Sequence, residues 1–164
     1  MIDSVVVFWR PVVEASNSRR LSRVTVPPTR IPLNSPFLNL PADRHLASNA
    51  LAFAIRDGFP VSPGHTLIVP RRLVATWFEA TREEQVAMLE LVDVVKAQLD
   101  AELHPDGYNI GINAGAAAGQ TVMHLHLHLI PRFHGDVPDP RGGVRHVIPG
   151  KGNYLANAAS GETE

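Results

Sequence analysis

The sequence has no cysteine among its 164 residues. Disulfide bonds, thiolate zinc sites and thiol nucleophiles are therefore excluded for this sequence. An excess of one charge is also missing, because 15 basic residues nearly balance 16 acidic residues and the formal net charge is -1. Since no global field favours nucleic acid or an anionic membrane, a bound anion must be held by local geometry.

Long apolar runs are missing as well. The longest run near the start, Val5 to Trp9, is far shorter than the core of a signal peptide or a spanning helix, and no basic segment precedes it. We therefore expect a cytoplasmic protein that binds neither membrane nor nucleic acid. A hydrophobic share of 45% and a charged share of 19% are ordinary for a folded domain, and the length fits a single one.

The composition changes along the chain. Residues 1–34 carry five arginines and several prolines without a sustained hydrophobic period, and we interpret them as a basic N-terminal extension of uncertain structure. From residue 35 onward, apolar segments alternate with turn signals, as a packed domain requires. We place this domain at residues 35–151 and a flexible C-terminal tail at residues 152–164.

Hydrophobic periodicity predicts the main elements of the domain. Residues 49–55 and 65–69 are predicted to form an antiparallel hairpin. A capping box at Thr81 to Glu84 and apolar residues at helical spacing predict a helix over residues 82–103, which Pro105 ends. Two further strands are predicted over residues 108–113 and 122–130, joined by a loop of small residues.

The most informative pattern is His124-Leu125-His126-Leu127-His128. On a strand, the three imidazoles would share one face, because successive side chains point to opposite sides. Alternate residues of a strand are about 6.5 to 7 Å apart, so neighbouring imidazoles could act on the same small substrate. Such a row is typical both of catalytic sites and of transition-metal sites, and the triplet alone leaves both open.

The surroundings of the histidines favour a phosphate. A run of small residues ends in Gln120 and Thr121, so a ligand could approach the backbone while two neutral donors lie close by. Asn113, just before this run, is a third neutral donor. A hairpin loop also favours small residues for structural reasons alone. Separately, the turn Pro63-Gly64-His65 places a fourth histidine at the start of a strand.

These motifs together resemble the histidine triad (HIT) family. The run Gly119 to Arg132 is similar to the family signature, while Pro63 to His65 and Asn109 to Asn113 fall where the family has a helper histidine and a phosphate-contacting asparagine. The resemblance covers about residues 35–150 and is strongest to diadenosine tetraphosphate hydrolase-like members. It implies an α+β fold: an antiparallel sheet of about five strands, one long helix and a shorter one, paired into a homodimer.

The resemblance also implies a reaction. The enzyme would cleave a dinucleoside polyphosphate at the α-phosphate, with His126 as the nucleophile that forms a nucleotidyl-histidine. The backbone carbonyl of His124 would accept the Nδ1 proton of His126 and orient that ring. His128 and His65 would hydrogen-bond the phosphoryl oxygens and the leaving group.

Further contacts follow from the same resemblance. Asn113, Gln120 and Thr121 would bind the phosphate, Asp57 the ribose hydroxyls and Ile55 the base. Many bacterial relatives carry paired cysteines that help bind structural zinc, whereas the corresponding stretch here begins at Ser35. We therefore expect no protein-bound metal and no bound cofactor, with Mg²⁺ acting only as a counterion of the substrate.

Two alternatives remain open. A nucleoside phosphoramidase or a phosphorylase would use the same nucleophile and differ only in the leaving group or the acceptor. A module without turnover would bind a nucleotide, or would hold a metal ion between His124, His126 and His128.

Overall fold

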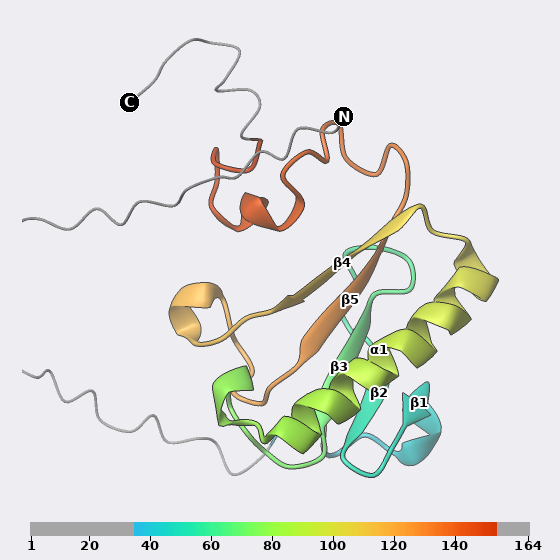
Figure 1. Cartoon of the computed structure of the whole chain (residues 1–164), viewed down its shortest axis with the longest axis vertical. Helices are drawn as coiled ribbons and strands as arrows, with labels where there is room; N and C mark the ends of the chain where they lie inside the picture. Colours follow the sequence, from blue (N-terminus) through green and yellow to red (C-terminus); the bar gives the residue numbers. More distant parts are fainter. Residues whose placement is uncertain (1–34, 154–164) are drawn as a thin grey trace, which may run out of the picture. The chain divides into compact units, whose positions relative to one another are not determined.

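The computed structural model describes residues 35–153. The predicted basic extension at residues 1–34 and most of the predicted tail, residues 154–164, lie outside this described part. Within it, five strands form one antiparallel sheet in the order β1-β2-β3-β5-β4, and the single long helix α1 crosses one face of the sheet (Figure 1). The bounds are β1 Ala47–Ser48, β2 Ala52–Arg56, β3 Thr66–Pro70, α1 Arg82–Leu103, β4 Gly107–Ile112 and β5 Leu127–Arg132.

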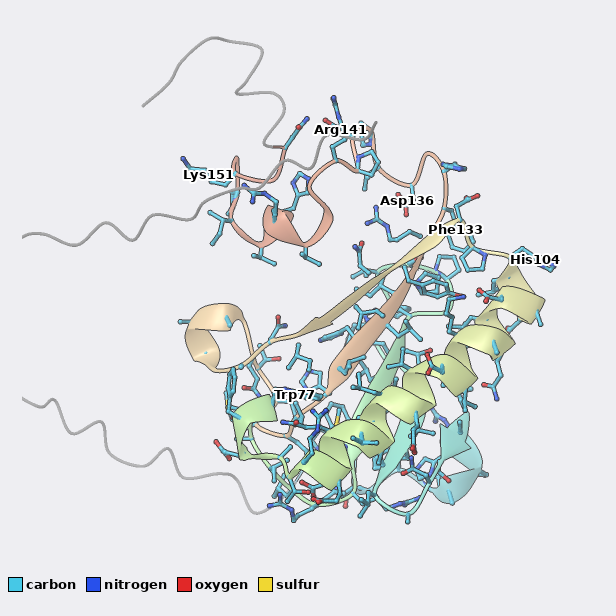
Figure 2. All side chains as sticks on the ribbon, in the orientation of Figure 1. Trp77, His104, Phe133, Asp136, Arg141 and Lys151 are labelled. Atoms are coloured by element: carbon cyan, nitrogen blue, oxygen red, sulfur yellow. The ribbon has the colours of Figure 1, made fainter. Side chains whose placement is uncertain are left out.

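Helix α1 begins and ends where the sequence predicts. The Thr81 hydroxyl accepts from the amide of Glu84, and the Glu84 carboxylate accepts from the amide of Thr81, which completes the capping box. At the other end His104 adopts a left-handed conformation with φ 50°, and Pro105 follows. In Figure 2, His104 marks the C-terminal end of the helix, and Trp77 lies in the short 3₁₀ turn that precedes it.

The sheet has a different hydrophobic cluster on each face. Helix α1 packs its buried side chains, among them Met88 and Leu99, against Ile68 and Leu127 of the sheet. The opposite face carries a smaller cluster, to which Phe53 and Leu67 belong and over which the segment at Phe37 lies. Because one residue of a strand points to the helix and the next points away, β2 and β3 supply both clusters.

Two predicted strands need correction. The strand predicted over residues 49–55 begins only at Ala52, because the Asn49 side chain accepts from the amides of Leu51 and Ala52 and so forms a turn between β1 and β2. The strand predicted over residues 122–130 begins only at Leu127 and continues to Arg132. Residues 121–126 leave the sheet, and the amide of Leu125 donates to Val74 instead of to a neighbouring strand.

In place of the expected shorter helix, the described residues contain 3₁₀ turns. Between residues 35 and 153 the short helical segments are four 3₁₀ turns, at Ala42–Arg44, Trp77–Glu79, Ala116–Ala118 and Gly143–Val147. No helix in these described residues is both long and apolar enough to cross a membrane.

Gly64 ties the turn before β3 to the end of helix α1. Its φ is +80°, and a Cβ atom placed there would lie 2.6 Å from Leu103 and 2.8 Å from Leu99. A side chain would therefore be strained in its backbone conformation, and the ends of both leucine side chains would have to shift. Since His65 follows directly, this close approach also sets where the fourth histidine lies.

We expect Gly64→Ala to lower the free energy of unfolding by about 2 to 4 kcal/mol, because a left-handed backbone strain adds to overpacking against two leucines. Urea unfolding would measure the change. Gly58→Ala is the matched control in the same connection, since a Cβ atom at Gly58 meets nothing within 4 Å. Equal stability of the two variants would contradict the role assigned to Gly64.

Candidate active site

His126 has one ring nitrogen fixed by the protein. Its Nδ1 lies 2.7 Å from the backbone carbonyl oxygen of His124, which can only accept, so Nδ1 carries the proton. The other nitrogen, Nε2, therefore has a lone pair. The residue as a whole is 8% exposed. This is the hydrogen bond that the family resemblance implied, and it gives His126 the tautomer that a nucleophile requires.

His124 is completely buried and both of its ring nitrogens are occupied. Nε2 lies 2.9 Å from the carbonyl oxygen of Pro70 and 3.2 Å from that of Arg72, so Nε2 carries the proton. Nδ1 consequently accepts from the Ser35 hydroxyl at 2.7 Å. Burial lowers the pKa of His124, which keeps the ring neutral. His124 is therefore an orienting residue, with no nitrogen left for a substrate or a metal.

The three histidines lie on one side of the sheet even though only His128 belongs to β5. The Phe37 ring contacts His124 and His126 with centroid distances of 5.9 Å and 5.2 Å, and the rings of His126 and His128 are 5.0 Å apart. Phe37 belongs to the face opposite helix α1. The grouping was thus predicted from alternation on a strand, but the tertiary contacts maintain it.

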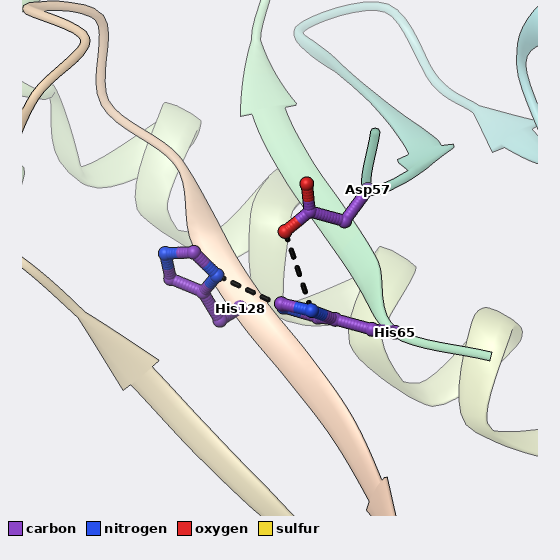
Figure 3. A group of neighbouring side chains, drawn as sticks. All are labelled: Asp57, His65 and His128. Carbon is purple, nitrogen blue, oxygen red and sulfur yellow. Dashed lines mark hydrogen bonds and ion pairs between the residues drawn. The ribbon is translucent and has the colours of Figure 1, made fainter. Parts of the chain in front are cut away.

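His65, His128 and Asp57 form a chain of polar contacts (Figure 3). His65 Nε2 lies 3.0 Å from His128 Nδ1, and His65 Nδ1 lies 3.2 Å from the Asp57 carboxylate. Asp57 follows β2 and His65 precedes β3, so the hairpin between them brings the acid and the imidazole together. At the far end of the chain, His128 Nε2 is buried and has no hydrogen-bond partner among the described residues.

Both imidazoles of this chain are neutral near pH 7. Burial lowers the pKa of His65, and the neighbouring Asp57 carboxylate only partly offsets this effect. Burial, together with repulsion from His126 and His65, lowers the pKa of His128 to about 4. A positive charge on either ring would be costly in this buried environment.

The same three residues are the candidate metal ligands in the described part of the chain. Asp57, His65 and His128 can each offer one ligand atom, and these atoms lie within 4.8 Å of one another. A carboxylate with two imidazoles suits zinc. However, a metal would have to replace the hydrogen bond between His65 and His128 and the ion-pair contact of His65 with Asp57. The metal-binding alternative considered from the sequence used His124, whose nitrogens are both engaged elsewhere.

The predicted phosphate-binding residues lie in different environments. Thr121 is exposed and Asn113 is half-buried, one residue beyond the pairing of Ile112 with Leu127 and so level with His126. Gln120 is only 3% exposed. Its amide nitrogen donates to the carbonyls of Ala75 and Val122, and its amide oxygen accepts from Gly115. Gln120 thus uses both amide hydrogens to hold the loop of small residues.

The residues predicted for ribose and base lie on β2 and just after it. Asp57 is partly exposed, and its second oxygen accepts from the amide of Phe59. Ile55 is 4% exposed and packs with Phe53, Leu67 and Val69, so most of its surface belongs to the hydrophobic cluster.

Sequence reasoning missed two features of the site. Ser35 lies 89 positions before His124, and no local pattern indicates that its hydroxyl fixes that imidazole. Gly111 pairs with His128 across β4 and β5, and a Cβ atom at Gly111 would meet nothing within 4 Å. The space beside His128 is therefore open to a ligand.

The antiparallel sheet has the long helix on one face, and its other face carries the alternating histidines and a helper histidine. This arrangement defines the histidine triad class. The sequence model of the HIT domain family matches residues 42–135, which is more than half of the chain. The protein therefore belongs to the HIT family.

Individual relatives agree with this assignment. An uncharacterized HIT-like protein of Mycoplasma pneumoniae is 36% identical over 54% of this chain and 61% of its own length. AP-4-A phosphorylase of Mycobacterium tuberculosis is 32% identical over 56% of this chain and 47% of its own length. The chain thus spans about half to three fifths of these curated relatives. The crystal structure of a HIT family member from Bacillus subtilis superposes with a TM-score of 0.58 at 26% identity, covering 77% of this chain and 93% of that one.

The buried neutral histidines make stability depend on pH. The folded pKa values of His65, His124 and His128 are lowered, so the unfolded chain binds more protons below pH about 6.5. The contribution of these histidines to the free energy of unfolding is therefore fully present above that pH, and it is lost as the pH drops toward 4. Each histidine contributes a slope of at most about 1.4 kcal/mol per pH unit.

Urea unfolding between pH 7.5 and 4.5 would measure this loss. We expect His128→Gln to flatten the slope, whereas His134→Gln, at an imidazole that is 93% exposed, should leave it as in the wild type. A wild-type stability that stays constant from pH 7 to 5 would rule out neutral burial of these rings.

Proposed function

We propose that this protein is a nucleotide hydrolase or transferase that cleaves dinucleoside polyphosphates, such as diadenosine tetraphosphate, at the α-phosphate. A covalent nucleotidyl group on His126 would be the intermediate. The observation that carries the proposal is the 2.7 Å hydrogen bond from His126 Nδ1 to the His124 carbonyl, which leaves Nε2 with its lone pair.

In the first step, His126 Nε2 attacks the α-phosphorus, and the P–O bond to the remaining polyphosphate breaks. The leaving group keeps the electron pair. Neutral imidazole is a nucleophile without a separate base, and burial keeps the neighbouring His128 neutral. Gly111 leaves room beside His128 for the phosphate chain, and the exposed Thr121 and half-buried Asn113 are donors for its oxygens.

In the second step, water attacks the phosphorus of the nucleotidyl group, and the P–N bond to His126 breaks. The electron pair returns to Nε2, which restores the enzyme. A phosphorylase would use inorganic phosphate instead of water, and a phosphoramidase would expel an amine in the first step. All three reactions share His126. The AP-4-A phosphorylase of Mycobacterium tuberculosis, similar over 56% of this chain, supports a dinucleoside polyphosphate as the substrate class.

Other parts of the proposal concern binding. Asp57 faces the ribose hydroxyls and the edge of Ile55 faces the base. Gln120 acts on the phosphate through the loop whose backbone it holds. Mg²⁺ accompanies the substrate as a counterion, and the protein needs no resident cofactor. The working form is a cytoplasmic homodimer that binds a small nucleotide and neither nucleic acid nor membrane.

Incubation with diadenosine tetraphosphate and Mg²⁺, with acid quenching and intact-mass measurement, tests the nucleophile. We expect release of a nucleoside monophosphate and a transient adduct of one nucleotidyl group. His126→Ala should lose the adduct and lower turnover by about a thousandfold or more. His134→Ala, at an exposed histidine, is the matched control.

Three results separate the possibilities. Turnover by His126→Ala at the wild-type rate would sink the proposal. Activity that appears only with a nucleoside phosphoramidate, or only with added inorganic phosphate, would move the assignment to the corresponding alternative. A protein without any adduct or turnover on these substrates would be a binding module.

A further inference from the structure

The segment that carries His124 and His126 is held by a neighbouring connection rather than by the sheet. Residues 121–126 precede β5 and lie outside its pairing with β3 and β4. The connection from the end of β3 to helix α1 passes beside them and supplies carbonyl groups (Figure 1). We call residues 70–75 of this connection the carbonyl segment.

Four backbone carbonyls of the carbonyl segment accept hydrogen bonds from residues around the nucleophile. Two of them accept from Nε2 of His124, at 2.9 Å and 3.2 Å. The other two accept from the amide of Leu125 at 2.7 Å and from the side-chain amide of Gln120 at 2.6 Å. The accepting residues are Pro70, Arg72, Val74 and Ala75. Since the carbonyl of His124 in turn accepts from His126, the direction of the nucleophile depends on where this backbone lies.

Arg72 fastens the carbonyl segment to the start of helix α1. Its Nε and Nη2 each lie 2.7 Å from one oxygen of the Glu84 carboxylate, which is a bidentate arrangement. Nη2 also donates to the carbonyl of Glu79 at 3.3 Å, so the same guanidinium holds the turn that follows the segment. Glu84 is only 4% exposed. The hydrogen bonds from Arg72 lower the pKa of Glu84, which keeps the carboxylate ionised in spite of its burial.

The capping of helix α1 does not require this charged pair. A capping box forms with glutamine as well as with glutamate, so the cap alone would not need a charge at Glu84. A buried carboxylate is costly unless it is paired, and such a pair adds little net stability. What the pair does provide is direction, because the planar guanidinium fits both carboxylate oxygens in one orientation only. The direction is passed on directly, since the carbonyl of Arg72 itself accepts from His124.

We propose that Arg72 is a positioning residue for the nucleophile: its bidentate pair with Glu84 fixes the carbonyl segment, and this segment fixes His124 and thereby the tautomer and direction of His126. The inference rests on the proposed function. A shift of the carbonyl segment would move Nε2 of His126 away from the line of attack on phosphorus. A misplacement of about 1 Å can slow a reaction about a hundredfold.

Two conservative substitutions test the pair from its two sides. Arg72→Lys keeps a positive charge beside the buried carboxylate but removes the bidentate fork. Glu84→Gln removes the negative charge and still fits a capping box, so the start of helix α1 is kept. Arg71→Lys is the matched control. It is the same substitution at the preceding arginine, whose Nε donates to the carbonyl of Asn49.

Rapid-quench kinetics with diadenosine tetraphosphate would measure adduct formation on His126 in variants that circular dichroism shows to be folded. We expect Arg72→Lys and Glu84→Gln each to slow this step about tenfold to a hundredfold at saturating substrate, with KM within about threefold of the wild type. The double variant should be no slower than either single variant, because both substitutions break the same pair. Arg71→Lys should react like the wild type.

The ¹⁵N shifts of the imidazole rings provide a second measurement that needs no turnover. In the wild type and in Arg71→Lys we expect a proton on Nδ1 of His126 and on Nε2 of His124, as their carbonyl partners require. In Arg72→Lys the shifts of His126 should report a mixture of both tautomers. A role in stability alone would leave these shifts unchanged in the folded variant.

The outcomes separate this inference from the proposed function. Adduct formation at the wild-type rate in folded Arg72→Lys or Glu84→Gln, a rise in KM alone, or additive slowing in the double variant would overturn the positioning role. Equal slowing in Arg71→Lys would overturn it as well, because the effect would not be specific to the pair. A wild type that forms no adduct would overturn the proposed function, and the shifts of His126 would still decide whether Arg72 positions that ring.

Discussion

The hydrogen bond from His126 to the backbone of His124 depends on how firmly His124 itself is held. Two carbonyl groups at the end of β3, of Pro70 and Arg72, accept from its Nε2, and Ser35 donates to its Nδ1 from the other side. The ring is completely buried. Because a buried imidazole with all its partners satisfied cannot rotate without losing them, the carbonyl that selects the tautomer of His126 stays in place. The reactive nitrogen is thus defined by contacts that no substrate touches.

A second set of contacts works from the hairpin between β2 and β3. Gly64 lets the turn approach the end of helix α1, and His65 next to it reaches both Asp57 and His128. The two sets meet where the rings of His126 and His128 lie 5.0 Å apart. One set fixes the tautomer of His126, and the other places His65 against His128. Neutral rings suit a buried site of this kind, since each has one proton and one lone pair and can both donate and accept.

Local patterns were informative where the determining interactions are short-range. The helix bounds follow from the capping box and Pro105, and the structure has them at the predicted residues. Strand limits were less predictable. Asn49 breaks one predicted strand through its own side chain, and residues 121–126 leave the sheet although their alternation continues. Alternation indicates that side chains face two sides, but backbone pairing decides whether the segment belongs to a sheet.

The sequence by itself determined the family motif and the absence of thiol chemistry, because both depend only on residue type and spacing, and the resemblance of that motif to the family implied which histidine is the nucleophile candidate. Only the tertiary structure decided that Ser35 contacts His124. It also decided that the Gln120 amide donates to Ala75 and so holds the loop. In the same way it brought His65 into contact with both His128 and Asp57. These contacts link residues that are far apart in the chain or whose side chains could equally face solvent. Contacts of this kind exist only when the fold has brought the atoms together, so no local pattern in the sequence indicates them.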